Sequence, residues 1–213
     1  MNLEKKFSVD LKNRENFITK YNGHFSNVYK IRDDNGEIYC GKFPKINNFV
    51  YLLDESVKKF NKAIKKQNIS RFTNCSLYEA GVSSDIFNRF DLSMKPEGVY
   101  LVKVEGVDLF LPAFVNELAV DMFPQELSFL DYQEYDQKKN ESFKIILKDG
   151  YYVWQDAFWD KNCFYSKEKG FKFNDFALWG KNGYFNPFVL EKEYYFRDAI
   201  RFSEEKKKEL GII

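Results

Sequence analysis

The stretch Tyr21–Phe43, YNGHFSNVYKIRDDNGEIYCGKF, contains the strongest fold signals in the chain. Residues 26–32 and 37–43 are rich in Val, Ile, Tyr and Phe, which favour strands. The sequence between them, Asp33-Asp34-Asn35-Gly36, is typical of a tight turn, so the two runs predict an antiparallel hairpin. A shorter strand is expected at 17–20, ahead of this hairpin.

Two features of this stretch would suit a phosphate-binding site. The turn between Tyr21 and Val28 contains Gly23 and Ser26, whose small side chains let backbone N–H groups come close to a phosphate. An ordinary hairpin turn is the alternative. Lys42 lies near the middle of an otherwise apolar strand, where its charge must find a partner. Its alternative is an edge strand from which the side chain reaches water.

The rest of the chain contains helical and extended patterns. Helical spacing of apolar residues predicts helices at 54–67, 77–89, 109–123, 125–148 and 203–213. Alternation of apolar and polar residues predicts a strand at 98–104. From residue 151 the pattern returns to short strands, with a hairpin around 166–170. The order of these elements predicts an α+β fold with two lobes.

A second group of polar residues lies in the C-terminal half. Trp154-Gln155-Asp156 is followed by Asn162 and, across the expected hairpin, by Asp175-Phe176-Ala177. Two carboxylates and an amide at loop ends supply the oxygen ligands that a divalent cation prefers. For Asp156 and Asp160, the alternative is an ordinary loop cap.

Composition limits the chemistry that the chain can use. The 213 residues carry 33 Lys and Arg against 32 Asp and Glu, so no global field draws the chain to nucleic acid or acidic lipid. A single histidine, His24, excludes a His-rich zinc site and leaves a serine or cysteine hydrolase one candidate base. Three widely spaced cysteines without a CxxC pair indicate a reducing compartment. The 23 Phe, 14 Tyr and 3 Trp can build a core from few large side chains.

The joint order of these features resembles the protein-kinase superfamily. The segment Tyr21–Val28 is similar to the kinase glycine-rich loop, GxGxxGxV, and Tyr39–Lys42 is similar to the strand that carries the VAIK lysine. Trp154-Gln155-Asp156 resembles the HRD triplet, Asn162 the catalytic-loop asparagine and Asp175-Phe176-Ala177 the DFG triplet.

The resemblance implies that ATP is the nucleotide and that Lys42 holds its α- and β-phosphates. Glu79, in the helix expected at 77–89, would form the ion pair that orients Lys42, and Glu55 is the rival for this role. The residues that would contact the nucleotide come from the glycine-rich loop, the following strands and the hinge: Gly23, His24, Phe25, Ser26, Val28, Cys40, Lys42, Val104 and Glu105.

The same resemblance implies roles for the polar residues of the C-terminal half. Asn162 and Asp175 would ligate Mg²⁺, and Asp156 would accept the proton of the substrate hydroxyl. The aromatic side chains between Trp154 and Trp179 are expected to pack around this catalytic loop.

A single minimal kinase-like domain is therefore expected over residues 1–213. Its N-lobe, with an antiparallel sheet, would cover about 14–104, its hinge about 104–107 and its reduced, mainly helical C-lobe about 108–213. Few residues follow Asp175, so the resemblance is to the small secreted effector kinases of pathogenic bacteria, which lack a conventional activation segment.

The function that this resemblance implies is ATP-dependent transfer of the γ-phosphoryl group to a serine or threonine of a protein, such as a host protein met by a bacterial effector. Three alternatives stay open. The alternatives to an active protein kinase are a pseudokinase scaffold, a kinase-fold transferase that moves another nucleotide-derived group, and an unrelated α+β domain.

Partners and location follow from smaller signals. The lysine-rich helix expected at 54–67 is either a solvated surface or a docking face for an acidic partner or a membrane surface. No nucleic-acid partner and no membrane insertion are expected, because basic strands with stacking aromatics and apolar runs of spanning length are both absent from the sequence. The N-terminus has no signal-peptide core, so the chain is expected in the cytoplasm as synthesised, with secretion into a host cell as a further expectation.

Overall fold

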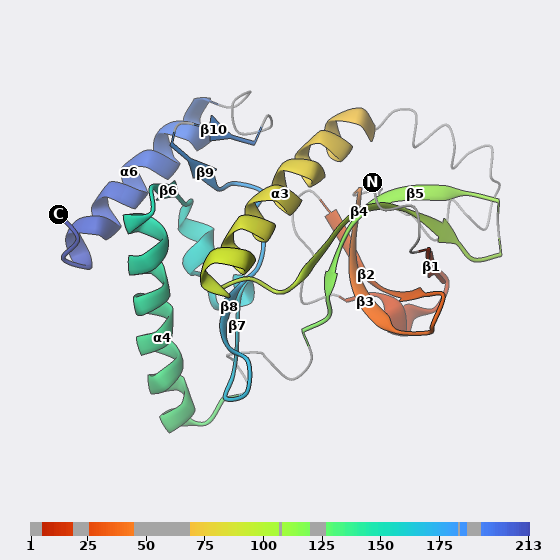
Figure 1. Ribbon diagram of the computed structural model, residues 1–213, viewed down its shortest axis with the longest axis horizontal. Helices are drawn as coiled ribbons and strands as arrows, with labels where there is room; N and C mark the ends of the chain where they lie inside the picture. The colour runs from red at the N-terminus through yellow and green to blue at the C-terminus, as the bar shows by residue number, and fades with distance from the viewer. Residues whose placement is uncertain are drawn as a thin grey trace. The chain divides into compact units, whose positions relative to one another are not determined.

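The fold of the computed structural model is α+β, as expected (Figure 1). The structure describes residues 6–18, 26–44, 69–106, 108–119, 127–182, 184–186 and 193–213. The chain divides into two compact units: unit 1 contains residues 1–80 and 95–118, and unit 2 contains residues 81–94 and 119–213. The helix α3 (Ile69–Phe90) contributes its first part to unit 1 and its last part to unit 2.

The described strands of unit 1 form a closed barrel in the order β1-β2-β3-β5-β4. They are β1 (Phe7–Val9), β2 (Ser26–Asp33), β3 (Ile38–Pro44), β4 (Pro96–Val104) and β5 (Phe110–Glu117). The short strand β1 closes the barrel because it pairs antiparallel with β2 and parallel with β4. A 3-10 helix, η1 (Arg14–Asn16), lies between β1 and β2 in the chain.

Alternate residues of each strand point into the barrel and form its core. The interior side chains include Phe7, Val9, Tyr29, Ile31, Phe43, Tyr100, Val102, Val104, Leu111, Ala113 and Val115. The residues between them, such as Lys42 on β3 and Phe114 on β5, lie on the outer face of the barrel. The candidate functional side chains of β3 are therefore outside the barrel core.

The hairpin of β2 and β3 confirms the strongest prediction from the sequence. In its turn, Asp33 Oδ1 accepts hydrogen bonds from the backbone N–H groups of Asn35 and Glu37, both at 2.9 Å. Gly36 has a φ of +83°, which glycine adopts without strain. The strand expected at 17–20 is reduced, in its described part, to a single bridge between Phe17 and Tyr29.

The helix expected at 109–123 is wrong, because residues 110–117 form strand β5. This strand pairs antiparallel with both β3 and β4. Both of its faces are covered: Val115 in the barrel interior is 0% exposed and Phe114 on the outer face is 1% exposed. A strand buried on both faces shows a continuous apolar run, so its period does not distinguish it from a helix.

Within the segment expected as the hinge, Val104 is the last residue of β4, and residues 105 and 106 form a turn that follows it. The Val104 N–H donates a 2.9 Å hydrogen bond to the Leu109 carbonyl, and the Val104 side chain lies in the barrel core. Glu105 accepts a 3.0 Å hydrogen bond from Ser8 Oγ. Unit 1 continues to Leu118, so Val104 and Glu105 lie inside unit 1. The hinge expected at about 104–107 stays a prediction.

Unit 2 combines helices with two small sheets. The helix α4 (Phe129–Lys148) agrees with the helix expected at 125–148. The helix α6 (Glu193–Glu209) overlaps the one expected at 203–213 but begins ten residues earlier. The strands β7 (Cys163–Ser166) and β8 (Gly170–Phe173) form the hairpin expected around 166–170. A second sheet, in the order β10-β9-β6, consists of β6 (Tyr151–Tyr152), β9 (Gly180–Lys181) and β10 (Tyr184–Phe185). Two 3-10 helices, η4 (Gln155–Phe158) and η5 (Asp160–Asn162), lie between β6 and β7 in the chain.

Aromatic side chains fill much of unit 2, as the composition leads one to expect. Phe143 of α4 stacks on Phe158 of η4 with ring centroids 3.5 Å apart, and it packs edge-on against Phe173 of β8. Phe158 also packs edge-on against Phe202 of α6. These rings join α4, β8 and α6 around η4. Trp159, expected among them, is instead 46% exposed.

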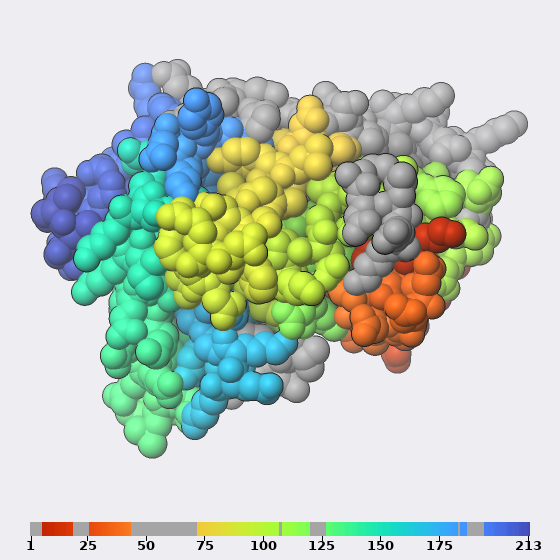
Figure 2. All heavy atoms as spheres, in the orientation of Figure 1, coloured from red at the N-terminus to blue at the C-terminus, as the bar shows by residue number. Residues whose placement is uncertain are grey.

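The first turn of α4 lies beside the turn of the β7–β8 hairpin (Figures 1 and 2). There Lys167 Nζ and Asp131 Oδ1 are 2.7 Å apart. This surface ion pair ties the start of α4 to the hairpin that follows η5 in the chain.

Two other helix predictions have different outcomes. The helix expected at 77–89 is present but begins earlier, since α3 starts at Ile69. The lysine-rich helix expected at 54–67, with Glu55, lies outside the described residues. Within the described ranges, no helix has the length and apolar character that crossing a membrane requires.

Candidate functional site

Lys42 of β3 forms a buried ion pair with Glu79 of α3. The Lys42 Nζ atom lies 2.5 Å from Glu79 Oε1, and the two side chains are 7% and 10% exposed. The predicted pairing of Lys42 with Glu79 is thus present within unit 1. A charge in an apolar strand needs such a partner, because an unpaired buried charge is strongly unfavourable.

Apolar side chains surround the Lys42 ammonium group on the outer face of the barrel. Val28 of β2 and Phe114 of β5 are the register partners of Lys42, and both are buried. The Lys42 Nζ atom lies 5.7 Å from the centre of the Phe114 ring. Burial raises the pKa of the nearby Cys40 thiol to about 12, although the charge of Lys42 opposes this shift. Cys40 is therefore a neutral thiol at physiological pH.

The residues expected to contact the nucleotide do not all lie near Lys42 in the described part of the structure. Ser26 and Val28 are the first and third residues of β2, and Val28 lies opposite Lys42. Gly23, His24 and Phe25 lie outside the described residues. Val104 is the last residue of β4, with its side chain in the barrel core, and Glu105 is the first residue of the turn that follows.

The polar residues of the C-terminal half come together within unit 2. Asp156 lies on η4 and Asn162 on η5, and Asn162 Nδ2 donates a 2.8 Å hydrogen bond to the Asp156 carbonyl. The Asn174 N–H donates a 2.9 Å hydrogen bond to the Asn162 carbonyl, which joins η5 to the residue before Asp175. Asp175 itself has a φ of 66°, a left-handed conformation that is uncommon outside glycine and asparagine.

The Asp156 carboxyl is in an unusual electrostatic environment. Burial and, to a smaller extent, the nearby charge of Asp175 raise the pKa of Asp156 to about 7. The charge of Lys161 opposes this shift without cancelling it. A carboxyl that titrates near neutral pH suits a general base, because its conjugate acid and its ionised form are both accessible at physiological pH.

A set of contacts that the sequence did not predict holds η5 in place. Asp160 Oδ1 accepts a 2.6 Å hydrogen bond from Tyr135 Oη and a 2.9 Å hydrogen bond from Lys139 Nζ, both on α4. Burial raises the pKa of the Asp160 carboxyl, but the hydrogen bonds from Lys139 and Tyr135 outweigh it and hold the pKa below its usual value. In the sequence, Tyr135 and Lys139 are one turn apart in a predicted helix, which places them on one face of that helix. This spacing does not indicate that their common partner is Asp160.

The C-terminal helix supports the chain just before η4. Ser203 of α6 is fully buried, and its Oγ accepts a 2.8 Å hydrogen bond from the Val153 N–H and donates one of 3.2 Å to the Val153 carbonyl. The Tyr195 ring packs edge-on against Trp154 with centroids 5.4 Å apart. Residues of α6 therefore hold the backbone of Val153 and the ring of Trp154, and Asp156 follows these two residues in the chain.

The donor set of unit 2 fits a magnesium ion that arrives with phosphates. Across the residues that the structure describes, there is no cluster of three or more His, Cys, Asp or Glu side chains able to hold a metal by themselves. Mg²⁺ is usually bound by one or two carboxylates together with substrate phosphates and water, so the carboxylate of Asp175 and the amide of Asn162 are groups of the chemical type that such an ion uses. The mutual repulsion of Asp156 and Asp175 also favours a cation near them.

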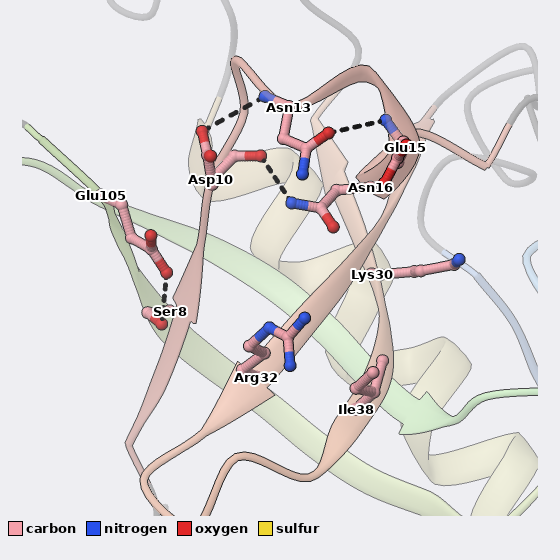
Figure 3. A pocket seen from close by; sticks show the side chains of 9 residues that line it. All are labelled: Ser8, Asp10, Asn13, Glu15, Asn16, Lys30, Arg32, Ile38 and Glu105. Carbon is pink, nitrogen blue, oxygen red and sulfur yellow. Dashed lines mark hydrogen bonds between the residues drawn. The ribbon is translucent and has the colours of Figure 1, made fainter.

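A separate pocket, with a volume of about 240 Å³, lies on the outer surface of unit 1 around η1 and the end of β1 (Figure 3). Its lining is mostly polar and consists of Ser8, Asp10, Asn13, Glu15, Asn16, Lys30, Arg32, Ile38 and Glu105. Of the residues that the sequence predicted to bind the nucleotide, it contains Glu105 alone. Since its other lining residues match no element of the kinase resemblance, this pocket carries no part of the function proposed below.

Comparison with protein-family models and with curated proteins gives no match to this chain.

Proposed function

We propose that the protein is an ATP-dependent protein kinase that transfers the γ-phosphoryl group to a serine or threonine hydroxyl. The observation that carries this proposal is the buried Lys42–Glu79 ion pair, which joins a lysine on the third barrel strand to a glutamate on the following described helix. The protein-kinase mechanism requires a lysine–glutamate pair between these two kinds of element. An edge lysine that reaches water, the alternative for Lys42, would not be 7% exposed.

In this mechanism unit 1 binds the nucleotide. Lys42 neutralises charge on the α- and β-phosphates, and Glu79 keeps its ammonium group in one position. Val28 and Cys40 contact the adenine ring, and cover of the phosphates by the residues around Gly23 stays a prediction from the sequence. The apolar, buried surroundings of Lys42 strengthen its attraction to phosphate because the local dielectric constant is low.

Unit 2 supplies the groups that act on the reacting oxygen atoms. Asn162 and Asp175 would hold Mg²⁺, which neutralises charge on the phosphates during transfer. Asp156 accepts the proton of the substrate hydroxyl as that oxygen forms a bond to the γ-phosphorus. The bond from the γ-phosphorus to the bridging oxygen then breaks and ADP leaves with the electron pair. A carboxylate can accept this proton without the help of a histidine. The proposed step therefore suits a chain that contains a single histidine, His24.

The test is an incubation of the full chain with Mg²⁺ and ATP labelled at the γ-phosphate, with a generic protein substrate. Lys42→Ala and Asp175→Asn should lose label transfer, whereas the exposed controls Lys103→Ala and Asp136→Asn should keep it. Asparagine is the matched replacement at position 175, since it tolerates a φ of 66° better than alanine.

The outcomes separate the candidate functions. Transfer that depends on Lys42 and Asp175 supports the kinase. Binding of ATP and Mg²⁺ by the wild type without transfer supports the pseudokinase, or a transferase that moves another group. Absence of any thermal shift with ATP and Mg²⁺ would overturn both. Action on a host protein after secretion by a bacterium stays a prediction, to be tested once transfer is shown.

A further inference from the structure

Trp159 and Lys161 form an exposed pair on the segment that carries Asp156 and Asn162. Trp159 lies between η4 and η5 and is 46% exposed. Lys161, the middle residue of η5, is also exposed, and its Nζ atom lies 4.4 Å from the centre of the Trp159 ring. A lysine in this position gains a cation–π attraction, so its ammonium group has a preferred place at the surface.

The backbone of this segment is fixed by its own hydrogen bonds. The Trp159 N–H donates a 3.0 Å hydrogen bond to the Asp156 carbonyl, and the Asn162 N–H donates one of 2.8 Å to the Trp159 carbonyl. The Asn162 side chain donates to the Asp156 carbonyl as well. A partner that binds Trp159 and Lys161 therefore does not have to order the segment, which lowers the cost of binding.

The charge of Lys161 is not neutralised by an acidic neighbour in the part of the chain that the structure describes. No described carboxylate forms an ion pair with it. The adjacent Asp160 is engaged elsewhere, because its carboxylate accepts the hydrogen bonds from Tyr135 and Lys139. The charge of Lys161 does act on Asp156, whose pKa it lowers against the effect of burial. Lys161 therefore presents a positive charge to a partner near the carboxyl proposed as the base.

We propose that Lys161 selects protein substrates that have an aspartate or glutamate within about two residues of the phosphoacceptor. This inference rests on the proposed function, because it takes Asp156 as the group that binds the acceptor hydroxyl. Residues of an extended substrate follow one another at about 3.3 Å each, so a carboxylate near the acceptor comes within reach of the lysine side chain. The Trp159 ring restricts that side chain, so less conformational entropy is lost when the ion pair forms.

The test measures label transfer by the full chain, with Mg²⁺ and ATP labelled at the γ-phosphate, to a peptide library. Each peptide has one fixed serine or threonine and, at one flanking position at a time, Asp, Ala or Lys in an otherwise random sequence. At one or more of these positions the wild type should prefer Asp to Ala by about threefold to tenfold in kcat/KM, the effect of one partly exposed ion pair. The preference should shrink at high salt, which screens exposed charges.

Variants of Lys161 assign the preference to its charge. Lys161→Ala should bring the ratio of transfer to Asp and Ala peptides close to one, Lys161→Arg should keep it, and Lys161→Glu should favour Lys peptides instead. Lys144→Glu, the same change at an exposed position of α4, is the control and should keep the wild-type ratio. The ratio is the readout because an effect of a variant on Asp156 itself acts on all peptides alike and cancels.

The outcomes separate this inference from the proposed function. If the wild type labels neither the peptides nor a generic protein, the proposed kinase function fails and the inference fails with it. If the wild type labels peptides without a preference for Asp at any position, the inference fails while the kinase function stands. If Lys161→Ala slows transfer to every peptide by the same factor, Lys161 acts on the reaction and not on the choice of substrate, and the inference is wrong.

Discussion

Lys42 Nζ and Glu79 Oε1 lie 2.5 Å apart, and neither side chain is more than 10% exposed. Two opposite charges at this distance stabilise one another, but each also loses the water that would otherwise solvate it. The pair therefore contributes little net stability, while the loss of one member leaves a buried charge without a partner. This asymmetry gives a test that separates folding from catalysis.

Lys42→Met should lower the free energy of unfolding by about 3–5 kcal/mol, because the Glu79 carboxylate stays buried without its partner. The double variant Lys42→Met with Glu79→Leu should regain most of this loss, since apolar side chains of similar volume can replace a buried ion pair. Urea unfolding measures both effects. Phosphoryl transfer should be absent from the double variant although it folds. A double variant that is as unstable as the single one would contradict this account of the pair.

Local sequence signals were sufficient for the β2–β3 hairpin, whereas the pairing of Lys42 with Glu79 was expected from the kinase resemblance. The turn Asp33–Gly36 has residues that fit its hydrogen bonds and its positive φ, and the flanking runs fix the register. Lys42 could be identified because a charge in an apolar strand needs a partner. Glu79 could be chosen as the partner of Lys42 because a helix was predicted at 77–89. The true start of α3 at Ile69 was not predicted, because residues 69–76 are weak helix formers.

The errors occurred where burial or long-range contacts decide the structure. Strand β5 is covered on both faces, so its apolar run resembles that of a buried helix, and the helix predicted at 109–123 is wrong for this reason. Asp160 was interpreted as a possible loop cap, but its partners, Tyr135 and Lys139, lie more than twenty residues earlier. Contacts across such distances depend on how elements pack, and no single sequence pattern contains them.

Asp160→Asn should loosen the segment that carries Asn162. The neutral amide cannot replace the charge-assisted bonds from Lys139 and Tyr135, so unfolding should become easier by about 1–3 kcal/mol. Phosphoryl transfer should also fall, and Tyr135→Phe, which leaves the Lys139 bond in place, should have a smaller effect on both. The measurement is urea unfolding together with the rate of label transfer. Equal stability of Asp160→Asn and wild type would rule out this anchoring role.

Phe143→Ala should destabilise unit 2 strongly. The Phe143 ring is 0% exposed and packs against Phe158 and Phe173, so its removal leaves a cavity in the aromatic core. Such substitutions cost about 3–5 kcal/mol. Phe129→Ala, on the same helix but 76% exposed, is the matched control and should change stability by at most about 0.5 kcal/mol. Thermal unfolding compares the two, and similar losses would show that the Phe143 contacts do not support the core.

Transfer activity should depend on the ionisation of Asp156. Its pKa of about 7 in the free protein means that kcat/KM should rise about tenfold per pH unit below pH 7 and level off above it. The pH profile of label transfer measures this. Asp175→Asn removes the charge that is the second cause of the raised pKa, so any residual activity should follow a profile moved to lower pH. A profile of the wild type without a step near neutral pH would exclude Asp156 as the base.

The same carboxyl should make stability depend on pH in a defined direction. In the unfolded chain Asp156 ionises near its usual pKa of 3.8, and in the folded chain near 7. Between these values the folded state binds a proton that the unfolded state has lost, so the contribution of Asp156 to stability falls as pH rises and is lost above pH 7. Asp156→Asn has no such titration and should gain stability over the wild type progressively across this window, by roughly 4 kcal/mol at most. Urea unfolding of the nucleotide-free proteins between about pH 4 and pH 8 measures the difference, with Asp136→Asn as the exposed control. A difference between Asp156→Asn and wild type that stays constant across this range would show that burial and Asp175 do not raise the pKa of Asp156.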